Sequence, residues 1–109
     1  MKIVTNVVVA DRAAAILASE VKKRRPGSRD VLALHFMASF TNADGTTVDG
    51  FAPGYTIDYV PDRDFSDDWL LARLPDGTAF RFMPKFEWSA DRRYVVDQVS
   101  SYTLSITAL

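Results

Sequence analysis

The stretch DRAAAILASEVKKRRPGSRDVLALHFMASF, residues 11–40, decides the fold because its apolar residues change period halfway along. In its first half, apolar residues recur at the spacing of one helical face; they are Ala14, Leu17, Ala18 and Val21. From Asp30 onward the period is two, which is typical of a strand. The stretch therefore predicts one helix followed by one long strand.

We expect the helix to run from about Arg12 to about Arg25. Asp11 has the properties of its N-cap, because a carboxylate can accept a hydrogen bond from an unpaired N–H of the first turn. Pro26 and Gly27 mark its end. Both faces of the following segment, Asp30 to Phe40, are mostly apolar, so it is predicted to be a central strand covered on both sides.

Shorter elements surround this pair. Val7 to Val9 is a β-branched run that predicts a first strand, and turn residues fill the loop from Thr41 to Gly54. Further strands are predicted at residues 55–59, 69–74, 78–83, 94–99 and 102–108, with Pro75-Asp76-Gly77 as a hairpin turn. The predicted fold is α+β, a single domain over residues 1–109 with one N-terminal helix packed on a β-rich layer of about six or seven short strands.

Composition excludes several functional classes. The 13 basic and 14 acidic residues give a net charge of −1, so the chain as a whole has no attraction for nucleic acid or anionic lipid. No apolar run approaches the roughly 18 residues of a membrane span. Thr5, Asn6 and Asp11 interrupt the apolar start, which argues against a signal peptide. With no cysteine there is no disulfide or thiolate site, and we expect a cytoplasmic protein.

His35 is the only histidine and lies in the middle of the long apolar strand. This position favours a satisfied core or sheet-face residue over a metal ligand or catalytic base. Asp58 with Glu87 is the carboxylate pair considered for acid–base chemistry, but no spacing selects it.

The segment from Asp62 to Asp68 is the most acidic. Asp62, Asp64 and Ser66 fit the first three odd positions of a calcium loop, but Asp67 replaces the required glycine and Arg73 the final glutamate. A solvated turn-forming loop is the better interpretation.

A basic cluster follows the helix; its members are Lys22, Lys23, Arg24, Arg25 and Arg29. Cations at the C-terminal end of a helix complement its dipole, which favours a structural role over nucleic-acid binding. Arg92 and Arg93 form a second basic group further along the chain.

Aromatic residues recur at a spacing of two; they are Phe80, Phe82, Phe86 and Trp88. This pattern predicts a core or a dimer face, with Arg81, Lys85 and Glu87 on the wet side of the sheet. We expect a homodimer formed through a strand edge or this aromatic face. The alternative is that the rings fill the space between helix and sheet in a monomer.

The order of elements resembles that of the HesB-like family, the A-type iron–sulfur carriers. The segments that carry the resemblance are Val8–Leu17, Val31–Phe36, Pro53–Tyr59, Phe80–Lys85 and Arg93–Asp97. It extends from about Val7 to about Ile106 and implies a HesB-like scaffold. The activity of that family rests on three cysteines, and this sequence has none. The resemblance therefore assigns no functional residue and implies a scaffold that has lost its cluster.

These observations favour a non-catalytic binding or structural domain with no cofactor, whose partner is a protein or a small molecule. The alternatives are a small enzyme using carboxylates or His35, and a weak nucleic-acid- or metal-binding protein. A concave pocket with converging polar groups would favour the enzyme, an apolar patch a protein partner, and a continuous basic face nucleic acid.

Overall fold

A computed structural model describes residues 2–24, 27–39, 41–49, 51–101 and 103–109. Its elements, in chain order, are β1 (Lys2–Ile3), β2 (Val7–Val9), α1 (Asp11–Lys22), β3 (Asp30–Met37), β4 (Gly54–Pro61), the 3₁₀ turn η1 (Asp62–Asp64), β5 (Leu70–Arg73), β6 (Ala79–Phe82), β7 (Tyr94–Gln98) and β8 (Leu104–Ala108). The described part of the chain is therefore α+β, with one helix and eight strands. The strand beyond the predicted number is β1, whose two residues are too few to show a periodic pattern.

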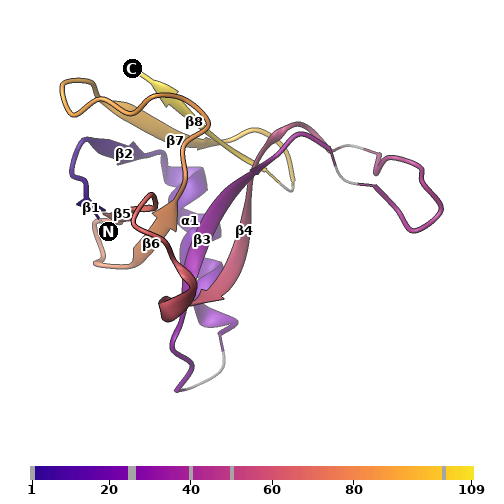
Figure 1. Ribbon diagram of the computed structural model, residues 1–109, viewed down its shortest axis with the longest axis horizontal. Coiled ribbons are helices and arrows are strands. Elements are labelled where there is room, and N and C mark those ends of the chain that lie inside the picture. Colours follow the sequence, from indigo (N-terminus) through magenta and orange to yellow (C-terminus); the bar gives the residue numbers. More distant parts are fainter. Residues whose placement is uncertain (1, 25–26, 40, 50, 102) are drawn as a thin grey trace.

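All eight strands belong to one mixed, strongly curled half-barrel sheet in the order β1-β5-β6-β3-β4-β8-β7-β2 (Figure 1). The pairs β1–β5, β3–β6 and β2–β7 are parallel, and the other neighbours are antiparallel. The two edge strands, β1 and β2, are consecutive in sequence. The sheet must therefore curl far enough for the short segment 4–6 to join its two edges.

The segment between the edge strands is held to the neighbouring elements by hydrogen bonds. The N–H of Val4 donates to Leu71 O at 2.9 Å, and the N–H of Tyr94 donates to Asn6 O at 2.9 Å. The side-chain amide of Asn6 also donates to the carbonyl oxygens of Ser89 at 3.0 Å and Arg92 at 2.7 Å. Residues 4–6 thus tie β5 on one side to the loop before β7 on the other, and we call them the edge clasp.

Helix α1 begins one residue earlier and ends sooner than the sequence predicts. Ala10 is the N-cap and makes no side-chain cap bond, so the expectation that Asp11 caps the helix is wrong. The N–H of Ala10 instead donates to Val96 O at 2.8 Å, which fixes the chain to β7 before the helix starts. Asp11 lies in the first turn, where its charge complements the helix dipole. The last helical residue is Lys22, and Arg25 lies outside the described residues.

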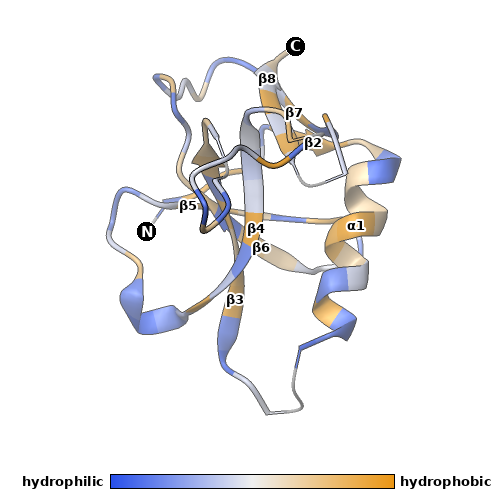
Figure 2. Cartoon of the chain, turned by 90° about the vertical axis from the view of Figure 1, so that its right-hand side faces the viewer, coloured by the Kyte–Doolittle hydropathy of each residue, from blue (hydrophilic) through white to orange (hydrophobic). Residues whose placement is uncertain are grey.

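The buried face of α1 is centred on Ala13 and Leu17, both fully buried. Ala14, Ile16 and Val21 are half-buried against the same core. The helix lies behind the sheet in Figure 1, and Figure 2 shows apolar residues in its middle turns and polar residues toward its C-terminal end. The structure therefore confirms Leu17 as a buried residue, but the buried face is centred closer to Ala13 than the sequence pattern predicted.

Strand β3 is the central strand that the alternating pattern predicts. Leu32, Ala33 and Leu34 are all buried, so both faces of the strand are covered at this point. It pairs with β4 over its whole length, from Asp30↔Pro61 to Met37↔Gly54. The loop that joins the two strands projects from the sheet (Figure 1).

Strands β5 and β6 form the predicted hairpin, with Gly77 at a φ of 91° in its turn. Phe80 and Phe82 on β6 are fully buried and pack in the core. The alternative that aromatic rings fill the interior is therefore correct for these two residues. No helix in the described part of the chain is long and apolar enough to cross a membrane.

Candidate functional site

The sheet is weakest where β4 meets β8. These strands share a single residue pair, Tyr55↔Leu104, whereas β4 pairs with β3 along its full length. Beyond Tyr55 the two strands diverge, and a cavity of about 590 Å³ lies beside the divergence. The cavity follows from the curl of the sheet, because β4 cannot follow both neighbours.

Six parts of the fold form the cavity walls, and two of them are the diverging strands β4 and β8. Ile16 of α1 lines one side, and Met37 of β3 another. The projecting β3–β4 loop contributes Val48 and Phe51, and the β7–β8 turn contributes Ser101. Most of the lining surface is apolar.

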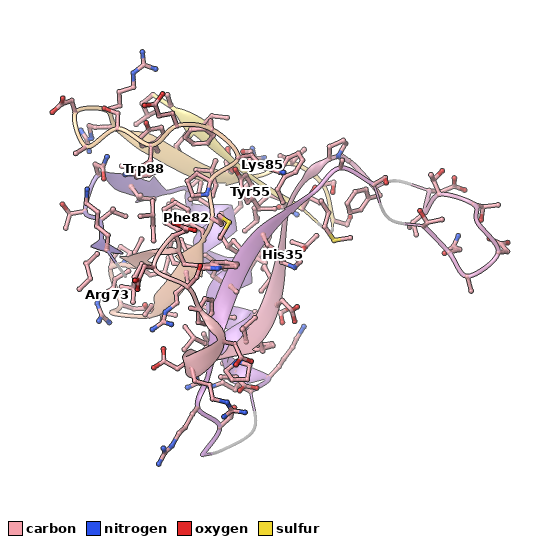
Figure 3. All side chains as sticks on the ribbon, viewed as in Figure 1. His35, Tyr55, Arg73, Phe82, Lys85 and Trp88 are labelled. Carbon is pink, nitrogen blue, oxygen red and sulfur yellow. The ribbon has the colours of Figure 1, made fainter. Side chains whose placement is uncertain are left out.

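His35 and Asp58 enter the cavity from adjacent strands. The register pairs His35 with Thr56 and Ala33 with Asp58. The side chains of His35 and Asp58 therefore project from the same face of the sheet and are diagonal neighbours on the two strands. His35 Nε2 lies 3.9 Å from Asp58 Oδ2, and the side chains are 44% and 61% exposed. Figure 3 shows His35 beside the β3–β4 hairpin, well to the right of Phe82 and Trp88. His35 is therefore a sheet-face residue at a cavity rather than a core residue.

Glu20 lines the cavity from the helix. Its Oε1 accepts a bond from Lys23 Nζ at 3.1 Å, while its backbone oxygen accepts one from the hydroxyl of Tyr59. Burial raises the pKa of the Tyr59 hydroxyl, and the Glu20 carboxylate raises it further. Tyr59 thus stays a protonated donor and ties the last turns of α1 to β4.

The carboxylate pair considered from the sequence, Asp58 with Glu87, is not brought together. Glu87 lines a second, more open depression of about 770 Å³, formed by the loop after β6 and by β8. His35 and Asp58 meet at the first cavity, whereas Glu20 lines it from the opposite face of β4, the face that carries Tyr59. Sequence reasoning missed Glu20, whose only signal is its place four residues after Ile16, on the same side of the helix.

An aromatic stack borders the second depression. The rings of Trp88 and Tyr94 are 3.9 Å apart and nearly parallel, and Phe86 stacks on Tyr94 at 5.4 Å. Phe82 contacts Trp88 edge-on at 5.3 Å and links this stack to the core. The four aromatic residues of the sequence pattern therefore run from the interior to the surface.

The acidic segment is a solvated turn, as its sequence predicts. Asp62 and Asp64 lie in η1, where Asp62 forms an ion pair with Arg81. The Arg81 side chain is only 12% exposed and lies over the ring of Phe65, 4.4 Å from its centroid. The prediction that Arg81 faces the wet side of the sheet is wrong, because η1 and the residues after it cover the guanidinium.

The basic clusters do not form one face. Lys23 pairs with Glu20, and Arg24 donates to Asp30 O at 2.7 Å, so part of the cluster binds the helix end to β3. The loop that carries Arg92 lies near the start of β7, at the opposite end of the molecule from the helix C-terminus (Figure 1). Among the described residues, no group of three or more His, Asp or Glu side chains could hold a metal ion.

Comparison with known proteins gives no relative: no family model, no curated protein and no solved structure matches the chain. Functional inference therefore depends on the geometry of the cavity and on its chemistry.

Proposed function

We propose that this protein is a non-catalytic binding domain that takes a small molecule with an apolar body into the cavity between α1, β4 and the β3–β4 loop. The observation that carries the proposal is the cavity itself, about 590 Å³, with a mostly apolar lining surface and polar groups from α1, β3, β4 and the β7–β8 turn. Small-molecule sites typically have roughly 300–1,000 Å³ and this kind of lining.

Binding is favoured over catalysis by the geometry of the polar groups. The distance of 3.9 Å between His35 Nε2 and Asp58 Oδ2 exceeds a hydrogen bond, so Asp58 does not orient the imidazole as a base. Both side chains are also largely open to water, which weakens electrostatic stabilisation of a transition state.

Titration of ¹⁵N-labelled protein with a library of small apolar and amphiphilic compounds tests this function. Binders should shift the amide signals of Met37, Val48 and Ser101. Val48→Trp should abolish the shifts of Met37 and Ser101 by filling the cavity, while Ala90→Trp at the second depression should leave all three intact. A library that moves none of these signals contradicts the proposal.

A small enzyme is the second candidate, favoured because His35 and Asp58 meet in a concave site. The two functions differ in the fate of the ligand. A binding domain returns every bound compound chemically unchanged after long incubation. Conversion that His35→Gln abolishes would favour the enzyme.

We also propose a homodimer. Its support is apolar exposure on the edge strands, with Ile3 of β1 65% exposed and Val8 of β2 39% exposed, together with Phe86 at 37%. Light scattering should give about twice the chain mass of 12.2 kDa at micromolar concentration, and Val8→Lys should return it to the monomer value. A mass of one chain at every concentration rejects the dimer.

The HesB-like resemblance remains a proposal about scaffold and origin. Its support is the order of elements, in which short strands, one helix and a long strand precede a loop, a second long strand and several short strands. The absence of cysteine supports loss of the cluster and a cytoplasmic location. Anaerobic reconstitution should leave the protein colourless.

A further inference from the structure

We propose that the ligand of the cavity is a primary amine carried on an apolar body. This inference rests on the proposed small-molecule site and adds the chemical class of its ligand. Its basis is the charge of the cavity lining and the position of the Asp58 carboxylate.

The lining is acidic. It contains the carboxylates of Glu20 and Asp58, which reach it from opposite faces of β4, and no lysine or arginine among the described residues. Lys23 pairs with Glu20 from outside the cavity, so this charge is partly neutralised. Asp58 has no such partner: within the described chain, His35 is the only basic side chain within ion-pairing distance of it. A cationic ligand would supply the missing charge.

The hydrogen bonds of Asp58 leave one oxygen for that ligand. Oδ1 accepts the N–H of Tyr59 at 2.8 Å. Oδ2 faces His35 Nε2 across 3.9 Å, a gap too long for a direct bond but suited to a single bridging donor atom. An ammonium group there would donate to Asp58 Oδ2 and to the imidazole nitrogen, which accepts when the ring is neutral.

The part of the cavity beyond His35 suits an apolar body. Met37 follows His35 on the same face of β3, and Val48 and Phe51 lie on the loop beyond it. A ligand anchored at Asp58 would therefore extend its carbon skeleton toward these side chains. A carboxylate ligand would instead meet the like charge of Asp58, and an alcohol would gain only a hydrogen bond without a ligand charge.

Three probes with the same phenylethyl body separate these cases: 2-phenylethylamine, 2-phenylethanol and 3-phenylpropanoate. Their affinities are measured by NMR titration at neutral pH, with the amide shifts of Met37 and Val48 as the reporters. We expect the amine to bind about tenfold more tightly than the alcohol, which is the gain from one charge-assisted hydrogen bond. The carboxylate should bind most weakly. Asp58→Asn should remove about this tenfold preference while leaving the alcohol unaffected.

Glu87→Gln, which removes the same charge at the second depression, is the matched control and should change nothing. Equal or tighter binding of the alcohol or carboxylate, or an amine affinity that Asp58→Asn does not alter, overturns the inference but leaves a small-molecule site. Failure of all three probes overturns the inference, and failure of the wider compound library as well overturns the proposed function.

Discussion

Gly54 stands at the single point of contact between β4 and β8, and its lack of a side chain makes that contact feasible. A Cβ added there would lie 2.7 Å from Leu104 O and 2.9 Å from Thr103 Cβ. Neither distance can be relieved by turning a flexible side chain. The closest approach of the two strands, and hence the position where the cavity begins, depends on this glycine.

Gly54→Ala should therefore lower the free energy of unfolding by about 1–3 kcal/mol, the usual cost of overpacking. Urea denaturation measures it, and the amide signal of Leu104 should shift. Gly45→Ala is the comparison, because Gly45 has φ +89° and nothing within 4 Å of an added Cβ. It should strain only its own turn and leave Leu104 unmoved. An unchanged unfolding midpoint for Gly54→Ala would show that β4 and β8 separate without cost.

The ion pair between Arg12 and Asp97 makes the free energy of unfolding depend on pH in the acidic range. Arg12 Nε and Nη2 donate to the two carboxylate oxygens at 2.6 and 2.9 Å. These bonds, with the N–H of Gln98, lower the pKa of Asp97 to about 2. Because the folded-state pKa is depressed, the contribution is present above the ordinary value of 3.8 and is lost as the pH falls toward 2.

Asp97→Asn should thus destabilise the protein at pH 7, and the difference from the parent should shrink as the pH falls from 4 to 2. Urea denaturation at several pH values measures both curves. Asp68→Asn, in the exposed loop after η1, should give a curve parallel to that of the parent. A difference for Asp97→Asn that stays constant down to pH 2 would assign the effect to packing rather than charge.

At the scale of the element, α1 is held by a narrow buried face. Leu17 is fully buried, whereas Val21 one turn later is half-buried. Leu17→Ala should cost roughly 2–5 kcal/mol of unfolding free energy, since it leaves a cavity in the core. Val21→Ala should cost less, and Ser19→Ala on the exposed face should cost almost nothing. Denaturant unfolding of the three variants checks this order, and equal losses would contradict the orientation of the helix.

Periodicity predicted α1 and β3 because these elements bury one face or both faces within a few residues, and the turn residues Pro75-Asp76-Gly77 predicted the β5–β6 hairpin. It did not predict β1, the parallel pairing of β3 with β6, or the cap at Ala10, because these depend on partners far along the chain. Ala10 is held at the N-cap position by the bond from its N–H to Val96 O, a contact that no local pattern contains. The prediction that Arg81 faces solvent was wrong for the same reason, because the residues after β4 cover its guanidinium and no local pattern shows this contact.

The candidate site was predicted only in part. His35 and Asp58 were singled out as residue types that can carry chemistry, but their meeting depends on the β3–β4 register. Glu20 comes from the helix, and it lines the same cavity because α1 packs through Tyr59 against the other face of β4. The cavity exists because β4 and β8 diverge, which is a property of sheet curvature rather than of any single segment.

At the scale of the whole molecule, the edge clasp determines whether the curled sheet stays curled. β1 and β2 are at opposite ends of the strand order, yet only residues 4–6 separate them in sequence. Asn6 is half-buried, and its side-chain amide donates to Ser89 O and Arg92 O on the loop before β7. The adjacent Thr5 is exposed. The amide protons of Asn6 thus hold one edge of the sheet in place.

Asn6→Ala should lower the free energy of unfolding by about 1–3 kcal/mol, because two hydrogen bonds are lost and two carbonyl groups lose a donor. Asn6→Asp should cost at least as much, since a carboxylate has nearly the same shape but cannot donate and would face two carbonyl oxygens. Thr5→Ala is the control and should be nearly neutral. Urea denaturation compares the three variants, while hydrogen exchange follows the N–H of Tyr94, which bonds Asn6 O. Faster exchange at Tyr94 in both Asn6 variants would show that the edge opens; full stability in Asn6→Asp would mean that shape, and not donation, holds the clasp.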